Sequence, residues 1–110
     1  MVNRIERTFK KLKAEGNKAL VSFVTAGDPN MKTSEQILFD LPKYGVDIIE
    51  VGIPFSDPMA DGPTIQRSSQ RAILAGSNLS KTFTIINKFR KVNSSTPIVL
   101  MGYFNPIFQF

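Results

Sequence analysis

Two residue types with distinctive chemistry are missing from this sequence, which has no cysteine and no histidine. The absence of cysteine excludes a disulfide framework, a thiolate metal site and a cysteine nucleophile. The absence of histidine removes the commonest acid–base side chain and any catalytic triad built on it. Proton transfer within these 110 residues must therefore use carboxylates, lysine or tyrosine.

Long apolar runs are missing as well. No stretch approaches the roughly 20 consecutive apolar residues that a membrane-spanning helix needs. The N-terminal stretch M-V-N-R-I-E-R-T-F-K-K-L-K is basic like a transit peptide, but Glu6, Glu15 and the lack of a serine-rich segment argue against that role. We therefore expect a cytoplasmic protein.

The net charge of +5 raises the question of nucleic-acid binding. The cations fall mainly on predicted helix surfaces, without the interleaved aromatic side chains that stack on bases. They include Lys10, Lys11, Lys13, Lys88, Arg90 and Lys91. We interpret them as solvated helix faces rather than as a nucleic-acid interface.

What is present is an alternation of strand and helix patterns. Apolar runs rich in β-branched residues predict strands at residues 19–25, 46–52 and 97–101. Four helices are predicted. The first begins at a cap on Asn3 and ends at Gly16, and the second covers about residues 30–44. The third runs from Pro63 to Gly76 after a cap at Asp61 or Gly62, and the fourth begins at a cap on Ser77 or Asn78. This order implies parallel strands joined by helical crossovers, in either a barrel or a doubly wound sheet.

Each predicted helix carries apolar residues that we expect to face a core. In chain order these are Ile5, Phe9 and Leu12; Ile37, Leu38 and Leu41; Ala72, Ile73 and Leu74; and Leu79, Phe83, Ile86, Phe89 and Val92.

The stretch of residues 46–66 holds the most informative chemistry. Glu50 stands within an apolar run, where a charged side chain is costly unless it is paired or used. Asp57 and Asp61 follow on a loop rich in proline and glycine. Carboxylates at a strand end and on the next loop are typical of α/β enzymes, which present acid and base groups there.

Three blocks of sequence resemble the tryptophan synthase α subunit family. They are E-V-G-I-P-F-S-D-P-M-A-D-G-P-T-I-Q from Glu50, L-V-S-F-V-T-A-G-D-P from Leu20 and P-I-V-L-M-G-Y-F-N-P from Pro97. The resemblance implies a (β/α)8 TIM barrel, a fold of about 250 residues. We therefore expect residues 1–110 to be the N-terminal part of one barrel domain, with the N-terminal helix and about the first three β/α units.

The resemblance also implies a reaction. The family cleaves indole-3-glycerol phosphate to indole and glyceraldehyde 3-phosphate, a retro-aldol step in tryptophan biosynthesis that needs no cofactor in this subunit. Glu50 matches the family's catalytic glutamate, which gives one proton and takes one back. Asp61 matches its second catalytic carboxylate, which accepts the indole N–H and stabilises positive charge on the ring; from spacing alone a helix cap is equally consistent.

Three further residues, Phe23, Thr64 and Tyr103, match positions at the family's substrate site. Phe23 is expected to line the indole pocket, although a core position is the commoner fate of such a side chain. Thr64 and Tyr103 are expected beside the closed site, and the alternative for Tyr103 is a half-buried aromatic at a strand end. Met101 is a fourth candidate from its place in the third strand. It either lines the pocket or packs the barrel interior, and interior packing is the preferred reading.

The family's α subunit docks on a β subunit that carries pyridoxal phosphate, in an α2β2 complex. The matching contact residues here are Asp57, Pro58, Phe104, Asn105 and Phe108, with Ile107 beside them. A regulatory subunit that only docks is the alternative, and another phosphate-ligand barrel such as an isomerase is a third. The presence of both Glu50 and Asp61 favours the enzyme.

No phosphate-binding pattern is present. Gly27, Gly52 and Gly62 form no glycine-rich cradle, and barrels of this kind usually bind phosphate on loops after strands seven and eight. Residues 1–110 alone are therefore expected to be inactive.

Overall fold

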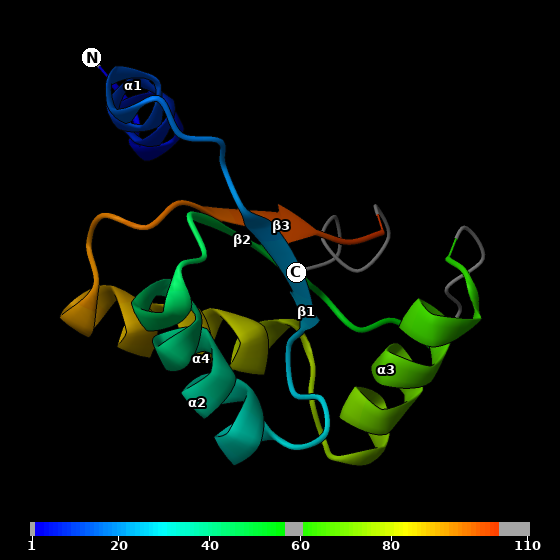
Figure 1. Ribbon diagram of the computed structural model, residues 1–110. Coiled ribbons are helices and arrows are strands. Elements are labelled where there is room, and N and C mark those ends of the chain that lie inside the picture. The colour runs from blue at the N-terminus through cyan, green and yellow to red at the C-terminus, as the bar shows by residue number, and fades with distance from the viewer. Residues whose placement is uncertain (1, 57–60, 104–110) are drawn as a thin grey trace.

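A parallel sheet of three strands forms the centre of the computed structural model, which describes residues 2–56 and 61–103. The strands are β1 (Val21–Thr25), β2 (Ile48–Gly52) and β3 (Ile98–Met101), and they lie in the order β1-β2-β3 (Figure 1). Both strand pairs are parallel. The predicted parallel arrangement is confirmed, with each of the three strands beginning one or two residues later than expected.

Helix α1 (Arg4–Glu15) has both predicted ends. The Asn3 side chain accepts a hydrogen bond from the backbone N–H of Glu6 at 2.9 Å, which satisfies one of the unpaired amides of the first turn. Gly16 closes the helix at φ 71°, a left-handed conformation that suits glycine. This helix lies apart from the others, beyond the start of β1 (Figure 1).

The helix predicted over residues 30–44 is two elements. The α-helix α2 (Met31–Asp40) begins after an Asn30 cap and gives way to the 3-10 helix η1 (Leu41–Tyr44). Pro42 explains the change, because proline has no N–H to continue the α-helical pattern and its ring crowds the preceding turn. Gly45, at φ 105°, ends the segment as predicted.

Two helices connect β2 to β3. They are α3 (Pro63–Leu74), which follows Gly62 as its cap, and α4 (Leu79–Val92), which Asn78 caps by accepting from the Lys81 amide at 2.9 Å. Ser77, the other candidate cap of α4, is instead buried and donates its hydroxyl proton to the Ala26 carbonyl at 2.8 Å.

The core lies between one face of the sheet and helices α2 and α4. Ile49 and Val51 of β2 are fully buried there against Leu38, Ile85 and Phe89. The rings of Phe39 and Phe89 stack with centroids 6.3 Å apart, so α2 and α4 also contact each other (Figure 1).

Four apolar residues predicted to face a core are exposed. Ile5 and Phe9 of α1 are 40% and 49% exposed, and Leu12 is the buried residue of that helix. Leu74 is 80% exposed because the buried face of α3 consists of Ser68, Ser69 and Ala72, and a residue two positions after Ala72 lies about 200° around the helix. Val92, the last residue of α4, is 75% exposed.

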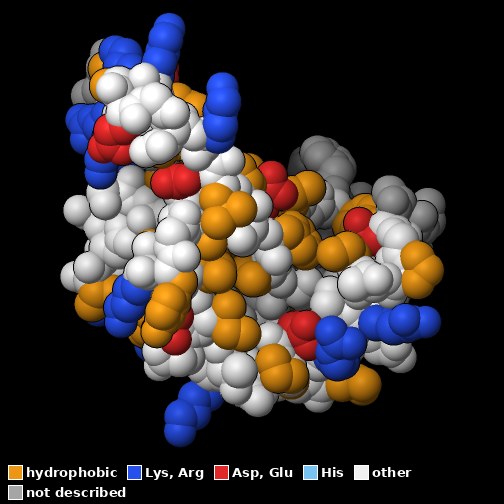
Figure 2. Space-filling view, in the orientation of Figure 1, with side chains coloured by type: hydrophobic (Ala, Val, Ile, Leu, Met, Phe, Trp, Pro, Cys, Tyr) orange, Lys and Arg blue, Asp and Glu red, His pale blue; other side chains and the backbone are white. Residues whose placement is uncertain are grey.

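The opposite face of the sheet carries the functional candidates. Because side chains alternate along a strand and Val24, Ile49 and Val51 belong to the core, Phe23 and Glu50 point the other way. In the space-filling view, hydrophobic side chains gather over the middle of the molecule, while lysine and arginine side chains project mainly from its periphery, including α1 (Figure 2).

Candidate active site

A cavity of about 370 Å³ opens at the C-terminal ends of the strands. Thr25, Gly52 and Met101 share one row across the sheet, so all three strands contribute to its wall. The other lining residues are Phe23, Ile53, Asp61, Ile65, Ser69, Gly102 and Tyr103. Parallel strands place their C-terminal ends at one edge, which is where such folds present their active sites.

Phe23 forms part of the cavity wall by lying directly over Gly52. A Cβ atom built on Gly52 would come within 2.5 Å of the Phe23 ring atom Cζ, closer than real atoms approach. Glycine at position 52 therefore makes room for the aromatic ring at this position of the sheet.

Asp61 and Tyr103 meet across the mouth of this cavity, although 42 positions separate them in sequence. The Tyr103 hydroxyl donates to Asp61 Oδ2 at 3.1 Å. The Tyr103 ring also packs on Phe55, with centroids 5.2 Å apart. Gln66 donates through Nε2 to the Asp61 backbone carbonyl at 2.7 Å, which ties Asp61 to the first turn of α3.

Glu50 lies on the same face of the sheet as Phe23, two residues further from the C-terminal end of β2 than Gly52. It is in register with Phe23 on β1 and Val99 on β3, and its side chain is half-buried. It therefore shares the sheet face of the cavity without being among the residues that line it. Asp61 therefore lines the cavity from a loop, and Glu50 lies on the adjoining face of the sheet, in the middle of β2.

Thr64 lies in a neighbouring cavity of about 250 Å³. That cavity shares Phe23, Thr25 and Ile65 with the first one, and Thr64 itself is exposed on the first turn of α3. Of the six predicted catalytic and substrate residues, four line the first cavity: Phe23, Asp61, Met101 and Tyr103.

Two contacts beside the site were not predicted from the sequence. Arg71 on α3 forms a paired hydrogen bond with Asp28, which follows β1. The bond to Asp28 raises the pKa of the Arg71 guanidinium, against the opposing effect of desolvation. The Thr25 and Ser68 hydroxyls lie 2.7 Å apart and are buried.

The predicted partner residues Asp57, Pro58, Phe104, Asn105 and Phe108 lie outside the described residues, as does Ile107. Within residues 2–56 and 61–103, no group of three or more acidic side chains is placed to hold a metal ion. Nor does any helix in this part of the chain have the length and apolar character needed to cross a membrane.

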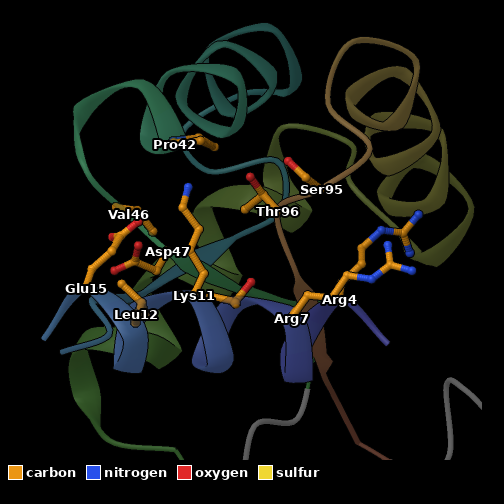
Figure 3. A pocket seen from close by; sticks show the side chains of 11 residues that line it. Arg4, Arg7, Lys11, Leu12, Glu15, Pro42, Val46, Asp47, Ser95 and Thr96 are labelled. Atoms are coloured by element: carbon orange, nitrogen blue, oxygen red, sulfur yellow. The ribbon is translucent and has the colours of Figure 1, made fainter. Parts of the chain in front are cut away.

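A separate cavity, of about 290 Å³, lies between α1 and the segments that lead into β2 and β3 (Figure 3). Glu15 and Asp47 stand at one side of it, Arg4 and Arg7 at the other, and Lys11 between them (Figure 3). None of the predicted site residues lines it. Its charges of both signs do not converge on one point, and we assign it no ligand.

Comparison with known proteins bears on the whole chain. The sequence model of the family described as "Tryptophan synthase alpha chain" matches residues 9–110. The tryptophan synthase alpha chain of Granulibacter bethesdensis is 53% identical over 106 residues, covering 96% of this chain and 38% of its own length. That of Geotalea daltonii is 54% identical over 107 residues, covering 97% and 40% respectively.

Solved structures agree. Tryptophan synthase subunit alpha from Legionella pneumophila matches with a TM-score of 0.95 and 45% identity, over 99% of this chain and 42% of that one. Tryptophan synthase from M. tuberculosis matches with a TM-score of 0.88 and 31% identity, over 98% of this chain and 43% of that one. This chain thus spans about two fifths of the length of these relatives. Of the two folds that the element order allowed, the TIM barrel is confirmed and the doubly wound sheet is not. Helix α1 and the first three strands of the barrel are present.

Proposed function

Because the chain belongs to the tryptophan synthase alpha chain family, we propose that a full-length chain carrying this sequence cleaves indole-3-glycerol phosphate to indole and glyceraldehyde 3-phosphate. The observation that carries the proposal is the contact between Asp61 and Tyr103 in a cavity walled by Phe23, with Glu50 on the same sheet face. The proposed place of action is the cytoplasm, in tryptophan biosynthesis.

Carbon–carbon cleavage requires two proton transfers. Indole is a poor carbanion leaving group until its C3 atom is protonated, and the substrate hydroxyl must lose a proton as the bond breaks. In our proposal the Glu50 carboxyl group delivers the first proton and accepts the second, so it returns to its starting state. Its place on a strand, rather than on a loop, holds it rigidly beneath the cavity.

Asp61 has an electrostatic role in this scheme. One carboxylate oxygen, Oδ2, accepts from the Tyr103 hydroxyl, which orients the group and leaves Oδ1 for the indole N–H. A negative charge placed there stabilises the positive charge that develops on the protonated ring. Phe23 and Met101 supply apolar wall for the ring, and Thr64 contributes from the start of α3.

The proposal requires no cofactor in this chain. Its partner is a tryptophan synthase β subunit carrying pyridoxal phosphate, in an α2β2 complex, and the docking residues we propose are Asp57, Pro58, Phe104, Asn105 and Phe108. A chain that docks without catalysis is the less favoured alternative, because both proposed catalytic carboxylates are present.

The test is indole release from indole-3-glycerol phosphate by the full-length chain, with and without the β subunit. Cleavage that rises strongly on addition of the β subunit is expected. A folded chain that releases no indole under either condition would refute the proposed activity. Complex formation without cleavage would favour the docking role instead.

A further inference from the structure

Asp28 and Arg71 join the loop after β1 to helix α3. Arg71 Nε donates to Asp28 Oδ1 at 2.7 Å, and Nη2 donates to Oδ2 at 2.9 Å. A planar guanidinium that engages both carboxylate oxygens fixes orientation as well as distance. Because the Arg71 side chain is 54% exposed, solvent screens the pair and its contribution to stability is small. Its main effect is therefore on geometry.

A second contact lies on the same face of α3. The Ser68 hydroxyl is 2.7 Å from the Thr25 hydroxyl at the end of β1, and both residues are buried. Ser68 and Arg71 are three positions apart, so they project from one side of the helix. Helix α3 lies apart from α2 and α4 and beside the end of β1 (Figure 1). Among residues 2–56 and 61–103, these two contacts are the side-chain hydrogen bonds that join α3 to β1 and to the loop after it.

Asp61 depends on the placement of α3. It stands two residues before Pro63, the first residue of the helix. The Gln66 side chain donates to the Asp61 carbonyl at 2.7 Å, and the Gln66 amide donates to the Gly62 carbonyl at 3.0 Å. A shift of α3 along or away from β1 would therefore move the Asp61 carboxylate relative to Tyr103, which is anchored at the end of β3.

We infer that Arg71 is a positioning residue for Asp61: its paired contact with Asp28 fixes α3 on β1 and so holds the Asp61 carboxylate against Tyr103. The inference rests on the proposed function, since Asp61 is the carboxylate proposed to face the indole N–H. Misplacement of a reacting group by about 1 Å can cost on the order of a hundredfold in rate.

The kinetic test compares Arg71→Met with Lys88→Met in the full-length protein, assayed by indole release. The two replaced cations are matched, since Lys88 is also 54% exposed and pairs with Glu35, but it joins α4 to α2 away from the cavity. We expect Arg71→Met to lower kcat about ten- to a hundredfold with a much smaller change in KM. Lys88→Met should leave both constants near wild type.

Two further variants protect the test against loss of folding. Arg71→Lys keeps the charge but not the paired geometry, and Asp28→Asn weakens the contact from the other side; both should lower kcat less than Arg71→Met does. A folded Arg71→Met with wild-type kcat would overturn the inference. If that variant does not fold, wild-type kcat in both milder variants would overturn it equally.

A structural readout separates this inference from the proposed activity. In a crystal structure of Arg71→Met, or of Arg71→Lys if the first does not fold, the Asp61 carboxylate should move by about 1 Å or more from the Tyr103 hydroxyl. An unmoved Asp61 would refute positioning whatever the assay shows. Absence of cleavage by the wild-type protein would instead refute the proposed function, and the crystallographic comparison would still decide the role of Arg71.

Discussion

At the scale of single residues, Glu50 is the side chain proposed to transfer both protons of the reaction. We predict that Glu50→Gln in the full-length chain lowers kcat by about two to four orders of magnitude, because glutamine can neither give nor take the required proton. Folding should be unaffected, since the two side chains have nearly the same shape. Indole release and circular dichroism provide the measurements.

Glu15→Gln is the matched control for Glu50→Gln, because Glu15 lines the other cavity, next to α1. It should keep wild-type activity. A Glu50→Gln enzyme with comparable kcat would remove Glu50 from its proposed role.

Gly52 is predicted to tolerate no side chain. In Gly52→Ala the new methyl group meets the Phe23 ring, so the ring must move and the cavity wall with it. We expect a loss of about 1–3 kcal/mol in the free energy of unfolding, as for other overpacked sites. Denaturant unfolding of the full-length chain measures it.

Gly62→Ala serves as the comparison for Gly52→Ala, because a Cβ at Gly62 meets nothing within 4 Å and its φ of −76° suits any residue. Its cost should be smaller, limited to the weaker cap that alanine provides. Equal costs for the two variants would show that the contact with Phe23 is not the cause.

At the scale of elements, helix α4 is held by the side chains that reach the core. Phe89 is 1% exposed and stacks on Phe39, whereas Val92 is 75% exposed on the same helix. Phe89→Ala should cost about 3–5 kcal/mol of unfolding free energy, and Val92→Ala less than about 0.5 kcal/mol. Chemical denaturation distinguishes them, and similar costs would contradict the packing described.

The sequence was sufficient to predict the order and kind of the elements, because each has a clear local signal. Asn3 and Gly16 bound α1, and the apolar run before Gly52 predicts β2. The sequence was insufficient to predict which residues of α4 are buried. Thr82 and Ile85 are buried although they were not predicted to be, whereas Val92 was predicted to be buried and is exposed. Hydropathy identifies the apolar residues of a helix but not the point at which the helix leaves the sheet.

The candidate site shows the same division. Six site residues were predicted, and the structure brings Asp61, Phe23, Met101 and Tyr103 together in one cavity. Glu50 and Thr64, the other two, lie beside that cavity. The contact of Arg71 with Asp28 was not predicted, because it joins residues 43 positions apart that carry no local pattern. Pairings of this kind depend on how a helix is placed on the sheet, which the sequence of the helix alone does not specify.

At the scale of the whole molecule, the outer edges of β1 and β3 have no further strand paired to them among the described residues. Val21 and Met101 are 44% and 46% exposed on these edges. Open edges and exposed apolar faces promote association. Residues 1–110 produced alone are therefore predicted to associate with increasing concentration and to release no indole.

Light scattering and the indole assay test this prediction, with the full-length chain as the reference for both. A monomeric 110-residue protein that cleaves the substrate at the full-length rate would contradict it.

The order β1-β2-β3 has a consequence for biosynthesis on the ribosome. Each new strand pairs beside the one made just before it, so no strand has to insert between two that are already joined. The strands can therefore join the sheet in the order in which they leave the ribosome. The bond from Tyr103 to Asp61 then closes only after β3 has been made, and the candidate site is completed by the last part of the chain that the structure describes.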